Sequence, residues 1–253
     1  MIVTYKEEGW HIITQRAHGI VAAQLAMAWR RKDRPQRWTE TVLAIAEHDD
    51  AEVELDGENV LTPTGGPLNF DMKTFDLAHC RKLFMLTQTK SRLIALLTSL
   101  HMVFLYGKEA AGNKEAGTFL EEQKLLQGGW AKELKMEKEE YLRLYDLLEW
   151  CDACSLLICG EKQQPEKRKM EISTGPDKKM YHLVQVDDAT LTVDPWPFEE
   201  KTFTVSFEWR LIKQLQFSSS AQFREAFQQA AVQETRWTVR AQKVAAKRKK
   251  VNV

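Results

Sequence analysis

The stretch Ala44-Ile45-Ala46-Glu47-His48-Asp49-Asp50 is the part of this sequence from which fold and function are best approached. An apolar run with helical periodicity ends in an imidazole, and two carboxylates follow directly. The apolar residues predict that the stretch packs against the interior, where a polar group without a partner is costly. A metal ion would be a suitable partner, because neutral imidazole and carboxylate are both good ligands. A helix-end cap or a solvated pair would explain the same residues, so the metal hypothesis depends on ligands elsewhere in the chain.

The composition is that of a globular protein without a dominant charge. The 253 residues are 43% hydrophobic, and 36 Lys and Arg balance 36 Asp and Glu, which indicates no general affinity for nucleic acid or for an anionic membrane. No apolar run reaches the roughly 18 residues of a membrane span, and the N-terminus does not resemble a secretory signal. The four cysteines do not form a disulfide framework pattern, so we expect a cytoplasmic protein with reduced thiols.

Helical periodicity dominates residues 15–160. Apolar residues recur at steps of three and four, which predicts helices over residues 15–30, 38–50, 73–87, 91–106, 118–127 and 137–159. Gly128-Gly129 is a plausible C-cap for the fifth of these helices. The turn-rich residues 51–70 follow the His-Asp stretch directly, and they are either a functional loop or a surface excursion.

Strand patterns occur at both ends of the chain. Residues 1–14 predict a hairpin, which is marginal alone and is therefore expected to join other strands. Residues 161–180 are rich in Lys, Glu, Pro and Gln and indicate a mobile loop. The C-terminal third predicts strands over residues 181–186, 190–193, 203–211 and 235–240, and a helix over 218–232.

These patterns predict a single α+β domain over residues 1–245. It is expected to be mainly α, with a helical core over residues 15–160. This core packs on a small antiparallel sheet and one helix, formed by residues 1–14 and 168–241. A flexible basic tail, residues 242–253, is expected to follow.

Several residues that could bind a metal lie on or beside the apolar faces of four predicted helices. Each alone could be a core residue that is hydrogen-bonded to the backbone. Aspartate, however, is rarely buried without a cation or several donors, and facing helices can converge ligands on a metal. The set is His18, His48, Asp49, His101 and Asp152.

The order of these residues resembles the HD superfamily of metal-dependent phosphohydrolases, whose metal ligands follow the pattern H…HD…D. His18 corresponds to the first histidine, His48 and Asp49 to the doublet, and Asp152 to the final aspartate. The resemblance implies that the helical core is HD-like.

Members of that superfamily with two metals carry further histidines between the doublet and the final aspartate, where His79 and His101 lie in this chain. Five short motifs resemble more closely a bacterial family of HD-like proteins without an assigned function. They are Ile13-Thr14-Gln15-x-x-His18, His48-Asp49-Asp50, Pro67-Leu68-Asn69-Phe70, Ser99-Leu100-His101 and Cys151-Asp152-x-x-Ser155-Leu156-x-x-Cys159.

The resemblance implies a metal-dependent hydrolase that acts on a small phosphorylated substrate, a phosphoester or phosphoanhydride. One or two divalent ions (Mn, Fe, Zn or Mg) would bind the five residues above and His79, and would activate a water molecule. Asp50 or Glu47 would act as base or orient a ligand. Arg81, Lys82 and Arg92 are either phosphate contacts or a solvated face.

Two alternatives remain open from the sequence. Some HD-like proteins are di-iron oxygenases, and a bound mixed-valent iron pair would identify that case. A non-catalytic binding or structural protein would use the same His and Asp side chains in a hydrogen-bonded network without metal. The sequence determines neither the substrate nor the oligomeric state.

Overall fold

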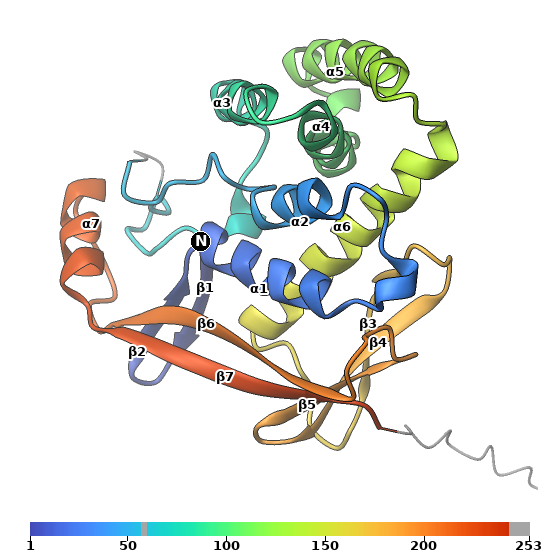
Figure 1. Ribbon diagram of the computed structural model, residues 1–253. Coiled ribbons are helices and arrows are strands. Elements are labelled where there is room, and N and C mark those ends of the chain that lie inside the picture. The colour runs from blue at the N-terminus through green and yellow to red at the C-terminus, as the bar shows by residue number, and fades with distance from the viewer. Residues whose placement is uncertain (57–59, 243–253) are drawn as a thin grey trace, which may run out of the picture.

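A helical layer covers one side of a twisted β-sheet in the computed structural model, which describes residues 1–56 and 60–242 (Figure 1). The helices are α1 (Gln15–Ala28), α2 (Trp38–Ala46), α3 (Leu77–Gln88), α4 (Arg92–Tyr106), α5 (Lys114–Leu134), α6 (Lys138–Cys159) and α7 (Ser220–Gln229), with short 3-10 turns η1 (Arg31–Asp33), η2 (Phe70–Met72) and η3 (Glu109–Ala111). Helices α1 and α6 lie next to the sheet, and α7 packs at one end of it (Figure 1). Within the described residues, no helix is long and apolar enough to cross a bilayer.

The sheet contains strands from both ends of the chain. Its strands are β1 (Ile2–Lys6), β2 (Gly9–Ile13), β3 (Lys169–Thr174), β4 (Met180–Asp187), β5 (Thr190–Asp194), β6 (Thr202–Ile212) and β7 (Val232–Arg240). In the described part of the chain they form one seven-stranded sheet in the order β1-β2-β6-β7-β5-β4-β3. Strands β5 and β7 pair in parallel, whereas the other neighbours are antiparallel.

The expected architecture of a mainly helical protein on a small antiparallel sheet is therefore wrong, although the α+β class is consistent with the structure. The sheet is large and mixed, because β7 returns after α7 and inserts between β6 and β5. A parallel neighbour requires a crossover connection, and the intervening β6 and α7 hide this partner from local sequence patterns. Strand β3 also forms within residues 161–180, where the charged composition had indicated a mobile loop.

Two helix boundaries also differ from the sequence prediction. Helix α5 runs through Gly128 and Gly129 and ends at Leu134, where Lys135 adopts a left-handed conformation with φ 54°. Tertiary packing of its buried face against α4 carries the helix past the two glycines. Helix α2 ends at Ala46, so the His-Asp pair lies in the turn that follows it. The predicted basic tail lies outside the described residues from position 243 onward.

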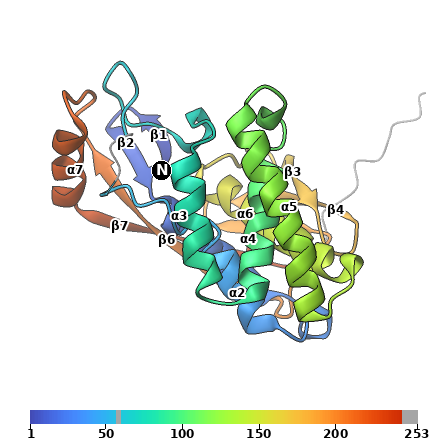
Figure 2. The ribbon, with the colours of Figure 1, turned by 90° about the horizontal axis from the view of Figure 1, so that it is seen from above.

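Close contact between α1 and α2 brings the two parts of the candidate site together. At Gly19 of α1, a side-chain Cβ would lie 2.4 Å from the carbonyl oxygen of Ala46, the last residue of α2. Only a glycine permits this approach. The neighbouring residue of α1, His18, thereby faces the turn that carries His48. Helix α4 contacts α2, and Figure 2 shows the two helices near each other in the view from above.

Candidate metal centre

The turn after α2 aims His48 and Asp49 into the protein. The side chain of His48 is only 1% exposed, and its Nδ1 donates to the carbonyl of Ile45 over 2.8 Å. A carbonyl oxygen can only accept, so Nδ1 carries a proton, and Nε2 is the ring nitrogen that faces the cluster. The amide of Glu52 donates to the carbonyl of Asp49 over 2.9 Å, which closes the turn.

Helix α1 contributes His18, which is held by a relay, that is, by two successive hydrogen bonds through Ser155 of α6. Ser155 donates its hydroxyl proton to the carbonyl of Asp152 over 2.8 Å, so it can only accept from Nδ1 of His18, 3.0 Å away. Nε2 of His18 lies 3.2 Å from Oδ2 of Asp49. Both contacts are favourable at once only if the ring is doubly protonated, or if a cation replaces the proton on Nε2.

Helices α6 and α4 complete the cluster with Asp152 and His101. Oδ1 of Asp152 lies 3.3 Å from Nε2 of His48 and 3.8 Å from Nδ1 of His18, and Oδ2 lies 3.8 Å from Nε2 of His101. The other ring nitrogen of His101 lies 3.4 Å from the hydroxyl of Tyr145 on α6. The five predicted residues thus meet at one point.

The imidazole rings are arranged around a common centre. The ring of His48 lies 5.0 Å from that of His18 and 5.1 Å from that of His101, with interplanar angles of 87° and 88°. Ligand atoms of His18, His48 and Asp152 all lie within 4.8 Å of one another, and so do those of His48, Asp49 and His101. These groups of three could hold a metal ion.

The charges in this cluster are strongly coupled. Burial lowers the pKa of His48, but the carboxylates of Asp49 and Asp152 outweigh this effect and raise it to about 10. Burial lowers the pKa of His101 to about 4, and the charge on His48 contributes, although Asp152 opposes both. The histidines lower the pKa of Asp49 and of Asp152 despite the opposing effect of burial. The site therefore stabilises a positive charge at its centre.

Two buried atoms at this centre are left without hydrogen bonds. Nε2 of His48 and Oδ1 of Asp152 have no hydrogen-bond partner among the residues that the structure describes, although they are 3.3 Å apart. An unsatisfied buried polar atom is costly, so its presence in a cluster of ligand-type side chains indicates that the site receives a further group.

The remaining predicted site residues lie outside this cluster. His79, on α3, faces Glu52, with Nε2 3.6 Å from the carboxylate. Asp50 pairs with Arg16 at 2.9 Å and with Lys90 at 3.1 Å, and Lys90 also pairs with Glu47 at 2.8 Å. The two carboxylates proposed as bases are thus engaged by cations.

Sequence reasoning missed the residues that orient the ligands. Ser155 holds His18, and Tyr145 lies beside His101. The side-chain Nε2 of Gln15 donates to Oδ2 of Asp49 over 3.0 Å. Ser155 follows Asp152 by three residues and Gln15 precedes His18 by three, a spacing that places side chains on one helical face. This spacing was a usable signal, since both residues lie in motifs quoted above.

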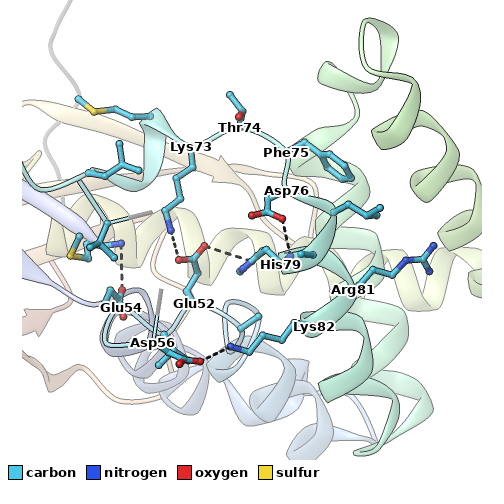
Figure 3. A pocket seen from close by; sticks show the side chains of 18 of the residues that line it. Glu52, Glu54, Asp56, Lys73, Thr74, Phe75, Asp76, His79, Arg81 and Lys82 are labelled. Carbon is cyan, nitrogen blue, oxygen red and sulfur yellow. Dashed lines mark hydrogen bonds and ion pairs between the residues drawn. The ribbon is translucent and has the colours of Figure 1, made fainter. Parts of the chain in front are cut away.

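A cavity of about 1110 Å³ adjoins the centre (Figure 3). Its wall includes Ala51 and Glu52, directly after the His-Asp turn, and Tyr106, five residues beyond His101 on α4. Burial raises the pKa of the Tyr106 hydroxyl, with further contributions from charges that include those of Asp49 and Glu52. Of the predicted phosphate contacts, Lys82 and Arg81 line the cavity, although Arg81 also pairs with Glu122, whereas Arg92 pairs with Glu133 and is not among the lining residues.

Comparison with known families accounts for most of the chain. Residues 1–214 match the profile of a family described as "Protein of unknown function (DUF3891)". The chain belongs to this family. The DUF3891 match contains all five clustered residues but ends before β7, although this strand lies inside the sheet. No significant match was found among curated proteins or among solved structures.

Proposed function

We propose that this DUF3891 protein is a metal-dependent hydrolase of a phosphoester or phosphoanhydride. The observation that carries the proposal is the pair of unsatisfied buried atoms, Nε2 of His48 and Oδ1 of Asp152, inside a cluster of three histidines and two aspartates. A structural hydrogen-bonded network is expected to satisfy its own members, so two unsatisfied ligand-type atoms that face each other in one cluster favour a bound group over a purely structural role. The resemblance of the ligand order to the HD superfamily supports the choice of reaction.

The residues present fit a transition metal. His18, His48 and His101 each turn Nε2 towards the carboxylates, while the opposite nitrogen contacts Ser155, Ile45 or Tyr145. Outer contacts of this kind set the tautomer and orientation of metal-binding histidines. Imidazole suits Fe or Zn better than Mg or Mn, which prefer oxygen ligands.

We infer one ion rather than two. The two groups of three ligands share His48, whose Nδ1 is already bound to the carbonyl of Ile45. Its single remaining nitrogen can serve only one ion. His79, which could have extended the centre, faces Glu52 instead. A di-iron oxygenase is therefore less well supported than a hydrolase.

A bound ion would supply Lewis acidity that polarises a phosphate oxygen and lowers the pKa of water. The protein's own contribution is to hold the ligands in one orientation and to exclude solvent from three histidines that are at most 2% exposed. Gln15 fixes Oδ2 of Asp49, and Ser155 fixes His18. The adjoining cavity gives a small substrate room beside the centre.

Elemental analysis of the purified protein tests the proposal. We expect near-stoichiometric transition metal in the parent, loss of metal in His48→Ala and Asp152→Ala, and full retention in the control His79→Ala. The metal found is then used to screen phosphatase, phosphodiesterase and nucleotidase activity. A parent that stays metal-free after reconstitution with Mn, Fe and Zn would overturn the proposal.

A further inference from the structure

The cavity beside the metal centre contains a second His-carboxylate group of a different kind. Lys73, just after η2, and His79, on α3, both point at the carboxylate of Glu52 inside the cavity (Figure 3). Lys73 forms an ion pair with Oε2 of Glu52, and Nε2 of His79 lies 3.6 Å from Oε1. Two nitrogen groups from separate elements thus converge on one anionic group.

We propose that Lys73 and His79 form a subsite for a phosphate group of a small ligand, and that the carboxylate of Glu52 occupies this subsite until the ligand binds. The proposal deepens the proposed function and rests on it only for the reaction that follows binding. Lys73 and His79 are positioned to donate to phosphate oxygens, and hydrogen bonds between ionised groups are the strong ones.

The exposure of this group favours exchange of partners. The side chains of Lys73 and His79 are 32% and 20% exposed, compared with 16% for Glu52. Ion pairs near solvent contribute little net stability, so little is lost when a ligand replaces Glu52. Glu52 can then turn towards solvent, because its partners Lys73 and His79 are themselves partly exposed.

Three other acidic groups of the cavity already have partners in the protein. Glu54 pairs with the amino group of Met1 at 3.4 Å, and Asp56 pairs with Lys82 at 3.6 Å. The carboxylate of Asp76 accepts from the amide of His79 at 3.1 Å and caps α3.

The cavity can also hold the body of a ligand. The rings of Phe75 and Tyr106 both line it and meet edge to face, with centroids 5.4 Å apart. They form an apolar part of the wall, and Lys73, His79 and Glu52 line the same cavity. A few polar groups on an apolar wall are typical of small-molecule sites.

Inorganic phosphate is the probe for this subsite. Its binding to the full-length protein is measured by calorimetry in a phosphate-free buffer, both as purified and after chelator treatment. We expect binding to persist without metal. Lys73→Met and His79→Gln should each weaken it roughly tenfold or more, whereas Glu52→Gln should tighten it several-fold, because the competing carboxylate is gone.

Lys82→Met is the matched control, since it removes the same charge from the same cavity and should change the affinity less than about threefold. Thermal melting shows whether each variant is folded. We expect folded variants, because the substituted side chains are partly exposed. An unchanged affinity in Lys73→Met, a weaker affinity in Glu52→Gln, or no binding in either the parent or Glu52→Gln overturns the subsite. The metal analysis is independent of these results, so a metal-free protein that binds phosphate in this pattern would remove the hydrolase and retain the subsite.

Discussion

The candidate metal centre and the cavity beside it use the same residue types in opposite ways. At the centre, three histidines and two aspartates are buried, and two of their atoms face each other without a hydrogen bond. In the cavity, Glu52, Lys73 and His79 are partly exposed, and opposite charges are already paired. The two groups are separated by one turn of backbone, from Asp49 to Glu52.

The difference shows that burial decides what a cluster of charged side chains indicates about ligand binding. A buried group cannot exchange partners with water, so an unsatisfied atom among buried ligand-type side chains favours a further ligand. A partly exposed ion pair loses little stabilising free energy when its charged groups change partners. Stability and metal affinity should therefore depend strongly on side-chain geometry at the centre, and much less on geometry in the cavity. Four predictions test this contrast, beginning with the largest effect.

The substitution Gly19→Ala should have the largest effect, because the added Cβ would lie 2.4 Å from the carbonyl oxygen of Ala46. Helices α1 and α2 must separate, which we expect to reduce the free energy of unfolding by about 2–3 kcal/mol. Metal affinity should fall as well, since His18 and His48 move apart. Chemical denaturation and metal titration measure the two effects.

Gly128→Ala serves as the control for this substitution. Apart from its chain neighbours and the backbone of its own helix, no described heavy atom lies within 4 Å of the position of its Cβ, and the residue is in the middle of α5. We expect it to stabilise the protein by about 0.5–1 kcal/mol. Equal stability of the two variants would show that the contact between α1 and α2 is not tight.

The substitution Ser155→Ala should come next, because it removes the acceptor that orients His18. Outer contacts of metal-binding histidines typically contribute ten- to hundredfold in affinity, so we expect a loss of about tenfold or more, with the fold retained. Tyr145→Phe should have a smaller effect, because its contact with His101 is 3.4 Å long. Competition with a coloured chelator gives both affinities, and a parent-like value for Ser155→Ala would contradict the relay.

The pH dependence of metal binding should distinguish the histidines of the centre. Because the carboxylates raise the pKa of His48 to about 10 against the effect of burial, this ring carries a proton at neutral pH that a metal must displace. Affinity should therefore rise about tenfold per pH unit between about pH 6 and 8, with release of one proton.

His101 should add nothing to this slope, because burial lowers its pKa to about 4 and leaves the ring neutral. Calorimetry in buffers of different ionisation enthalpy counts the protons released. An affinity that is flat over this range would mean that His48 is already neutral before the metal binds.

The substitution Lys82→Met should have the smallest effect on stability. Its side chain is 41% exposed, and that of its partner, Asp56, is 76% exposed, with 3.6 Å between the charged atoms. We expect a change in the free energy of unfolding of less than about 0.5 kcal/mol, and unchanged metal content. A large loss in thermal melting would show that pairs in the cavity contribute as much as contacts at the centre.

Local pattern was sufficient to find the clustered residues. His18, His101 and Asp152 interrupt apolar helical faces, and His48 and Asp49 follow such a face, so periodicity alone directs them inward. His79 shows the limit of this reasoning. Its position on a helix was foreseen, but its partner, Glu52, comes from a loop whose path the sequence did not define.

The sequence by itself determined which residues could act as ligands, because the period of an α-helix decides which side chains face the interior. Only the tertiary structure decided which nitrogen of each ring is free, since the partners of His18, His48 and His101 include a serine and a tyrosine on another helix. It also decided the sheet, in which β7 lies between β6 and β5. Pairing between distant segments depends on how the whole chain packs, and local patterns do not record it.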